Sequence, residues 1–181
     1  SDTMADLTAE GLDLAIRIST ADALPPALVA RPLQRMAYVL VAHPDYLRAQ
    51  PPIAAPQDLL AHPCMSLGYG LFQNLVELVP TSDPAAPPTK LRLNTPITIA
   101  SSHGMLRALR SGPGAGIALM ADFVANEPLR RGELVQVLPD WQLTGGYAPR
   151  TVYAVYAPGP HIPPKLRAML DYLQEQVKDS I

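Results

Sequence analysis

Residues 101–120 read Ser-Ser-His-Gly-Met-Leu-Arg-Ala-Leu-Arg-Ser-Gly-Pro-Gly-Ala-Gly-Ile-Ala-Leu-Met, which predicts a helix, a glycine-rich turn and a buried strand in succession. Ser101 and Ser102 are suited to cap the helix, because a serine oxygen accepts from a free backbone N–H in the first turn. Gly112, which a proline follows, ends the helix in a left-handed conformation. The apolar run at 117–119 is typical of a strand covered on both faces.

The glycines between 112 and 116 favour a packing turn over a phosphate-binding loop. A phosphate loop needs its glycines between a strand and the start of a helix, whereas here they lead from a helix to a strand. The polar start of the helix, at Ser101, Ser102 and His103, is a better ligand site. Unpaired N–H groups at a helix N-terminus attract anions, so we expect a small carboxylate there.

Length and composition fit a globular protein and exclude some partners. The 181 residues can bury a sizeable core, as one domain or as two small lobes. The chain is 48% hydrophobic and 17% charged, with a formal net charge of -2. That balance gives no electrostatic footprint for nucleic acid or an anionic membrane, so these residues are not expected to bind DNA by themselves.

The sequence predicts no disulfide, metal site or cofactor. Cys64 is the single cysteine, and we expect it to be a small buried residue. The histidines lack the close spacing of a metal site. They are His43, His62, His103 and His161. No apolar run is long enough for a membrane-spanning helix and no signal-peptide pattern begins the chain, so we expect a cytoplasmic location and no membrane partner.

Expected helices and strands alternate along the chain, which favours a parallel type of α/β architecture. Short helices are expected at 3–11, at 45–50, from 56 and from 121, and longer ones from 101 and 163. Strands are expected at 12–18, at 64–67, at 134–138 and at 151–157, with an interrupted strand at 91–99. The segment 28–42 is expected to turn into one long strand, and 80–88 is expected to be an exposed loop.

Ligands of open α/β sheets bind beyond the carboxyl ends of the strands. Ser19 and Thr20 follow one expected strand, and Ser66 ends another. Gly68 and Tyr69 lie in the loop that leaves the second strand. These residues are therefore candidate ligand contacts, with an ordinary polar loop or a turn glycine as the alternative for each.

Seven segments resemble the effector-binding domain of LysR-type transcriptional regulators in their order and spacing. The first is Glu-Gly-Leu-Asp-Leu-Ala-Ile-Arg-Ile at 10–18. The others lie at 39–47, 114–118, 132–135, 138–141, 152–156 and 164–168. Together they extend over nearly the whole chain, so we identify it as a member of this family.

The resemblance implies two Rossmann-like lobes of the periplasmic-binding-protein type II, joined by two crossover strands at 38–41 and 152–155, with the effector in a cleft between them. Lobe one would comprise 1–38 and 155–181, incomplete at its N-terminus, and lobe two 39–154. The family's winged helix-turn-helix DNA-binding domain is absent from these residues. Family pocket positions match Ser19, Thr20, Ser66, Gly68, Tyr69, Ser101, Ser102 and His103.

The resemblance also implies a function without catalysis. A small effector, preferably an organic acid, would close the lobes about the crossovers and change how the intact protein binds DNA. Homodimers or tetramers would form through this domain, and only the missing domain would contact DNA. A solute-binding protein of a transporter is the main alternative. An enzyme using Tyr69 and His103 as acid–base groups is the third.

Overall fold

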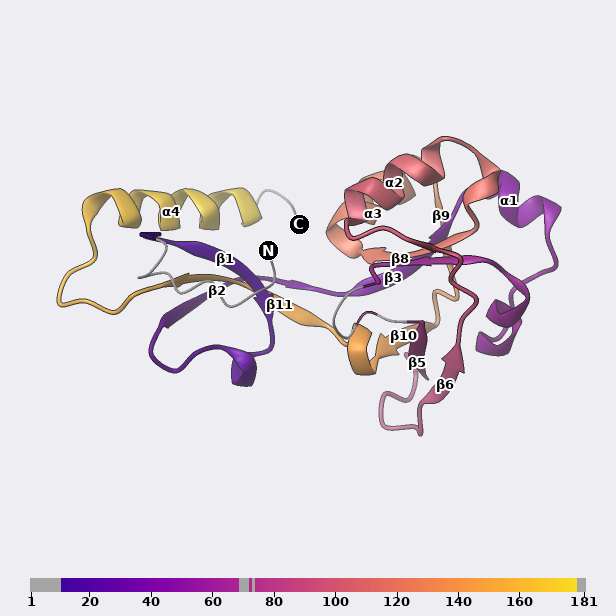
Figure 1. The fold of residues 1–181 in the computed structure, drawn as a ribbon, viewed down its shortest axis with the longest axis horizontal. Coiled ribbons are helices and arrows are strands. Elements are labelled where there is room, and N and C mark those ends of the chain that lie inside the picture. The colour runs from indigo at the N-terminus through magenta and orange to yellow at the C-terminus, as the bar shows by residue number, and fades with distance from the viewer. Residues whose placement is uncertain (1–10, 69–71, 73, 179–181) are drawn as a thin grey trace. The chain divides into compact units, whose positions relative to one another are not determined.

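The structure is a computed structural model that describes residues 11–68, 72 and 74–178. The chain forms two compact units, one of Ser1–Met36 with Arg150–Ile181 and one of Ala37–Pro149, here called unit 1 and unit 2 (Figure 1). These boundaries differ from the predicted 1–38, 39–154 and 155–181. The reason is that the strand that begins at Arg150 pairs with unit 1 strands from its first residue.

In its described residues, unit 1 is a three-stranded antiparallel sheet with one long helix on a face. The strand order is β1 (Ala15–Ser19), β11 (Arg150–Tyr156) and β2 (Val29–Met36). A short 3-10 helix, η1 (Ala21–Ala23), follows β1, and the helix α4 (Pro164–Lys178) ends the unit. The core between α4 and the sheet consists of Ala154, Tyr156, Leu166 and Leu170, with Leu14, Leu33 and Ile162 packed against it.

The described part of unit 2 contains two sheets and three α-helices. The larger sheet has the order β7-β4-β8-β3-β9, and the smaller has the order β10-β5-β6. The strands of the larger sheet are β3 (Tyr38–Ala42), β4 (Cys64–Ser66), β7 (Ile97–Thr98), β8 (Ile117–Ala121) and β9 (Val135–Val137). Those of the smaller sheet are β5 (Leu75–Pro80), β6 (Thr89–Arg92) and β10 (Trp141–Thr144). The helices are α1 (Pro44–Ala49), α2 (Ser102–Arg110) and α3 (Asp122–Arg130).

The strands are mostly antiparallel, so the expected parallel architecture is right for only part of the larger sheet. In the described residues, the parallel pairings are those of β4 with β7 and with β8. The strand β3, which continues from β2 with only Ala37 between them, runs antiparallel to β8 and β9. The smaller sheet is antiparallel throughout.

The stretch around α2 has the predicted form. Ser101 is the N-cap and accepts a hydrogen bond from the N–H of Gly104 at 3.3 Å. After the helix, Gly112 has a φ of 131°. All five residues of β8 are buried, as expected for a strand covered on both faces.

Three other predictions need correction or lie outside the described residues. The single strand expected at 28–42 is in fact two, β2 and β3, which belong to different units and are separated at Ala37. The helix expected from Pro56 is a 3-10 helix, η2 (Pro56–Ala61). The helix expected at 3–11 falls on residues 1–10, which the structure does not describe.

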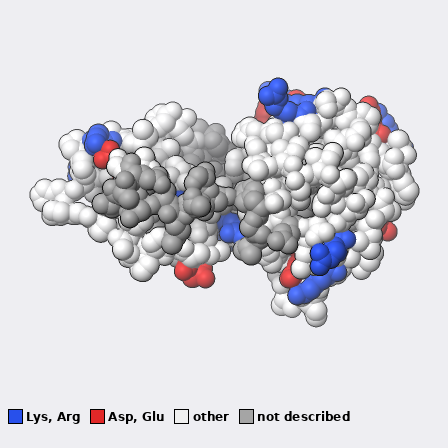
Figure 2. Space-filling model, viewed as in Figure 1, with Lys and Arg blue, Asp and Glu red and all other residues white. Residues whose placement is uncertain are grey.

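Two features of the described part bear on possible partners. No helix in it is long and apolar enough to cross a membrane. On the face shown in Figure 2, the described Lys and Arg side chains form small separate groups rather than one continuous basic patch. The visible surface thus agrees with the small net charge of the sequence.

Candidate functional site

The carboxyl ends of three strands meet at one edge of the larger sheet of unit 2. The strand β4 is parallel to both β7 and β8, so all three end on the same side. Ser66 and Thr98, the last residues of β4 and β7, are direct partners in the sheet. The helix α2 begins soon after β7, which brings its first turn to this edge, where α/β sheets bind ligands.

The first turn of α2 offers hydrogen-bond donors to a ligand. The N–H groups at the start of a helix have no partner within the helix. Ser101 caps one of them, that of Gly104. The Oγ of Ser102 accepts from the N–H of Ala121 at 3.1 Å, which leaves its hydroxyl hydrogen free to donate. His103 is exposed beside it. This combination suits an anion.

The other predicted residues of this edge are held mainly by backbone geometry. Ser66 is only 1% exposed, and its carbonyl accepts from the N–H of Ile99 at 3.0 Å. Gly68 has a φ of +71°, and a Cβ there would lie 2.6 Å from the Cβ of Thr98. The turn therefore requires glycine at this position. Tyr69 lies outside the described residues.

The remaining two predicted residues lie in unit 1. Ser19 ends β1 and pairs with Thr151 of β11. Thr20 comes next, and its side chain forms a hydrogen bond with Asp22 that is the largest cause of the lowered pKa of that carboxyl. The hydroxyl of Thr20 is therefore already engaged by a carboxylate. The structure thus brings Ser66, Gly68 and the start of α2 together in unit 2, and places Ser19 and Thr20 in the other unit.

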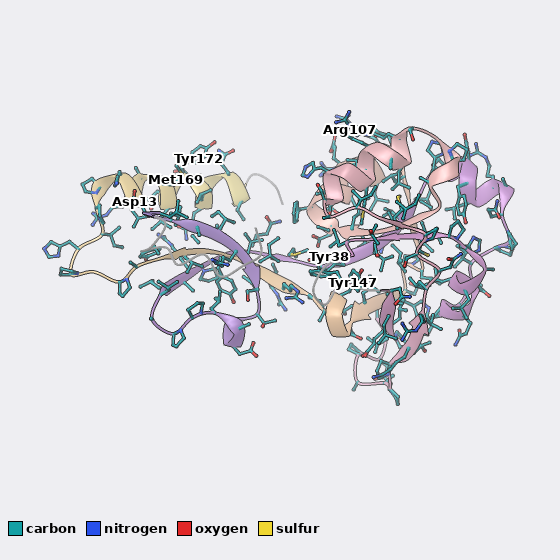
Figure 3. All side chains as sticks on the ribbon, in the orientation of Figure 1. Asp13, Tyr38, Arg107, Tyr147, Met169 and Tyr172 are labelled. Carbon is teal, nitrogen blue, oxygen red and sulfur yellow. The ribbon has the colours of Figure 1, made fainter. Side chains whose placement is uncertain are left out.

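The sequence analysis missed two groups of residues at the same edge of the larger sheet. Ala121 ends the buried strand β8 and Asp122 follows it, so the rule that selected Ser66 should have selected them too. The second group consists of the rings of Tyr38, Phe72 and Tyr147, whose centroids lie 5.1 to 5.5 Å apart in pairs (Figure 3). They come from three distant segments, so no local spacing in the sequence predicts that they pack together.

The described residues show no arrangement that would support catalysis by a metal or by the cysteine. No group of three or more His, Cys, Asp or Glu side chains among them could hold a metal ion. Cys64 is 1% exposed, and burial raises the pKa of its thiol to about 12. Since the thiolate is the reactive form, this cysteine is not a nucleophile at neutral pH.

Comparison with known proteins identifies the class to which this two-unit α/β fold belongs. The sequence pattern of the family described as the LysR substrate binding domain matches residues 1–178. The chain belongs to this family, the ligand-sensing domains of LysR-type transcriptional regulators, which have the periplasmic-binding-protein type II fold and are not enzymes.

Individual relatives and solved structures support the same family assignment. The probable HTH-type transcriptional regulator LtrA of Klebsiella pneumoniae is 33% identical over 179 residues, which are 95% of this chain and 53% of that protein. The full-length virulence activator AphB of Vibrio cholerae superimposes with a TM-score of 0.76 at 26% identity, over 97% of this chain and 56% of AphB. The regulatory domain of CrgA from Neisseria meningitidis superimposes with a TM-score of 0.76 at 24% identity, over 98% of this chain and 81% of that domain.

The chain spans about half the length of the curated relatives that it matches. Regulatory domains of this family bind small effectors and oligomerise. Since the curated relatives are transcription regulators, the family supports the regulator over the solute-binding protein and the enzyme considered from sequence.

Proposed function

We propose that the chain senses a small organic acid, whose carboxylate binds at the start of α2 in unit 2. The observation that carries the proposal is the hydrogen bonding of Ser102. Its oxygen already accepts from the N–H of Ala121, so its hydroxyl hydrogen is available to donate to a bound acceptor such as a carboxylate. The free N–H groups of the first turn and the positive end of the helix dipole favour the same charge.

The residues assigned to the proposed site rest partly on the structure and partly on the sequence alone. In unit 2 the exposed side chains of Ser101 and His103 flank Ser102 on the same turn. Ser66 stays a predicted contact on its position at the end of β4, since its side chain is buried and its carbonyl accepts from Ile99. Ser19 and Thr20 stay predicted effector contacts, on their position after a strand and on the family resemblance.

In the intact protein, which we take to be a regulator that acts on DNA in the cytoplasm, effector binding would change DNA binding. The change would pass through a homodimer or tetramer whose contacts include this domain. The winged helix-turn-helix domain expected from the family would make the DNA contacts. A full-length protein whose DNA contacts stayed the same at saturating effector would contradict this mechanism.

A thermal-shift screen tests the ligand class. Small aliphatic and aromatic carboxylates are added to the parent chain, to Ser102→Ala and to Ser111→Ala. Ser111 is a matched control, because it lies at the other end of α2 and its hydroxyl donates to the carbonyl of Ala108. A ligand at about 100 times its Kd stabilises the folded chain by about 2.7 kcal/mol, a rise of several degrees in Tm.

The expected result is a rise for the parent and for Ser111→Ala, and a much smaller rise for Ser102→Ala. Each variant is compared with itself without ligand, so the stability that Ser102→Ala loses with its bond to Ala121 does not enter. An equal rise in all three proteins would place the carboxylate elsewhere. The corresponding neutral amides should give no rise, and a rise with the amides would contradict an anion site.

A further inference from the structure

The chain passes between the two units at two places that lie next to each other in one pair of strands. Met36 ends β2 and Arg150 begins β11, and these two residues are direct partners in the unit 1 sheet. Their neighbours in sequence, Ala37 and Pro149, are the first and last residues of unit 2. The contacts that hold Ala37 within unit 2 therefore determine at which residue the first connection joins the rigid part of unit 2.

Asp122 holds both backbone groups of Ala37. The N–H of Ala37 donates to the Oδ2 of Asp122 at 2.9 Å, and the N–H of Asp122 donates to the carbonyl of Ala37 at 2.9 Å. The other carboxylate oxygen, Oδ1, accepts from the N–H of Phe123 at 2.7 Å, which fixes the orientation of the side chain. We call this arrangement the Asp122–Ala37 clamp.

Aromatic packing holds the same end of unit 2. Tyr38 directly follows the clamped residue, and Tyr147 lies shortly before the second crossing (Figure 3). Their rings meet edge to face with centroids 5.5 Å apart. Phe72 contacts both, at 5.1 and 5.2 Å. Both segments that lead into the crossings are thus anchored inside unit 2.

The clamp is also connected to the start of α2. Ala121, the residue before Asp122, donates its N–H to the Oγ of Ser102 at 3.1 Å. Ala121 is in addition the direct sheet partner of Tyr38. A change in the hydrogen bonding of Ser102 therefore reaches Asp122 and Ala37 through adjacent residues.

We propose that Asp122 is a positioning residue that locks the first crossing to unit 2, so that motion between the units is confined to the Met36–Ala37 and Pro149–Arg150 links. It also carries changes at Ser102 to the first of these links. This second part rests on the proposed effector site, whereas the first part depends only on the clamp.

Distances between spin labels test the clamp without any ligand. Labels are attached at Arg107→Cys in α2 and at Asp171→Cys in α4, both of which are exposed positions. The native Cys64 is buried and stays unlabelled. Asp122→Ala should widen the distribution of distances between the labels at least twofold, because Ala37 is no longer fixed within unit 2.

Asp58→Ala is the matched control. The carboxylate of Asp58 also accepts two backbone N–H groups, those of Ala54 and Ala55 at 2.9 and 2.8 Å, in the same unit but away from the crossings. Its removal should leave the distribution unchanged. An unchanged width in Asp122→Ala, or equal widening in both variants, would overturn the proposal. If Asp122→Ala fails to fold, Asp122→Asn replaces it, since one remaining acceptor oxygen cannot serve both Ala37 and Phe123, and partial widening is expected.

Amide exchange followed by NMR tests the connection to the proposed site. Exchange at Ala37 should become at least tenfold faster in Asp122→Ala and a few fold faster in Ser102→Ala, with no change in Ser111→Ala. An unchanged rate in Ser102→Ala would disprove the connection and leave the clamp intact. Neither the spin-label nor the exchange experiment contains an added carboxylate ligand. Their outcomes are therefore independent of whether the thermal-shift screen finds a ligand.

Discussion

The two units differ in how much of their apolar surface they bury by themselves. In unit 2 the strand β8 is buried at every position, and α2 buries Met105, Leu106 and Leu109. In the described part of unit 1, Ile16 and Ile18 on β1 are 50% and 44% exposed. Met169 and Tyr172 on α4 are 48% and 55% exposed (Figure 3).

The geometry of unit 1 explains this exposure. Ile16 is the sheet partner of Ala154, which lies in the core beneath α4, so Ile16 points to the same side of the sheet. The helix contacts β2, at the other edge, and Ile16 and Ile18 of β1 stay exposed. Unit 1 therefore carries an apolar surface on the side of its sheet that α4 only partly covers, and unit 2 has a closed core.

The largest effect is expected from a substitution in unit 2 at a position that has no space for a side chain. Gly116 has a φ of +75°, and a Cβ there would lie 2.2 Å from the carbonyl oxygen of Pro63. That oxygen accepts from the N–H of Ile117 at 3.0 Å, so it cannot move without weakening the junction of β4 and β8. Gly116→Ala should lower the free energy of unfolding by about 4 kcal/mol or more, measured by urea titration. A loss below about 1 kcal/mol would contradict the close packing described.

Truncation of one buried leucine in each unit compares the two cores directly. Leu109 in unit 2 and Leu170 in unit 1 are both 0% exposed. We expect Leu109→Ala to cost about 3–5 kcal/mol and Leu170→Ala about 2–3 kcal/mol, because the more open surroundings of α4 can collapse into the space. Urea titrations of both variants measure the costs. An equal or greater cost for Leu170→Ala would mean that the core of unit 1 is as closed as that of unit 2.

Each unit also contains an aspartate whose pKa is lowered in the fold. The side chain of Thr20 lowers the pKa of Asp22 in unit 1, and the backbone N–H groups of Ala55 and Ala54 lower that of Asp58 in unit 2. A lowered pKa stabilises the fold above the ordinary value of 3.8, and this stability is lost as the pH falls through the folded-state value. Stability below pH 3.8 should therefore fall less steeply in Asp22→Asn and Asp58→Asn than in the parent, measured by thermal unfolding between pH 2 and 6. Slopes identical to the parent would show that these bonds do not persist in solution.

The smallest effect is expected on the exposed surface of unit 1. Met169→Lys should change the free energy of unfolding of this chain by no more than about 0.5 kcal/mol, because nearly half of the side chain is already in water. Ala125→Lys, at a fully buried position of α3, is the contrasting control and should be strongly destabilising. A loss above about 2 kcal/mol for Met169→Lys would indicate that this side chain is covered in solution.

Local signals in the sequence predicted much of unit 2. Ser101 before α2, the glycine after it and the apolar run of β8 each act within a few residues, and the structure agrees with all three. Ser102 is instead the first residue of α2, and its Oγ accepts from Ala121 rather than from an N–H of the first turn. The same kind of signal predicted α1 and β4. The ends of β4 and β8 and the start of α2 form the edge at which the candidate site lies, whereas α1 follows β3 at the opposite edge.

The parts that the sequence could not predict depend on contacts between distant residues. No glycine or proline marks the break between β2 and β3 at Ala37. The backbone of Ala37 is held instead by Asp122, which lies 85 residues away in the sequence. The burial of Ser66 and the engagement of Thr20 by Asp22 also depend on neighbours that no periodicity reveals. Antiparallel pairing of β3 was missed because hydrophobic patterns show which residues are buried and not the direction of the neighbouring strand.

The order of strands in unit 1 has a consequence for synthesis on the ribosome. Its middle strand, β11, is made after the whole of unit 2, whereas both of its outer strands are made before it. The outer strands therefore wait, without their hydrogen-bonding partner, until more than a hundred further residues have been added. Unit 2 is continuous in sequence and can fold while the chain is still growing. Unit 1 closes last, and its two early strands are the segments that a chaperone would have to protect in the meantime.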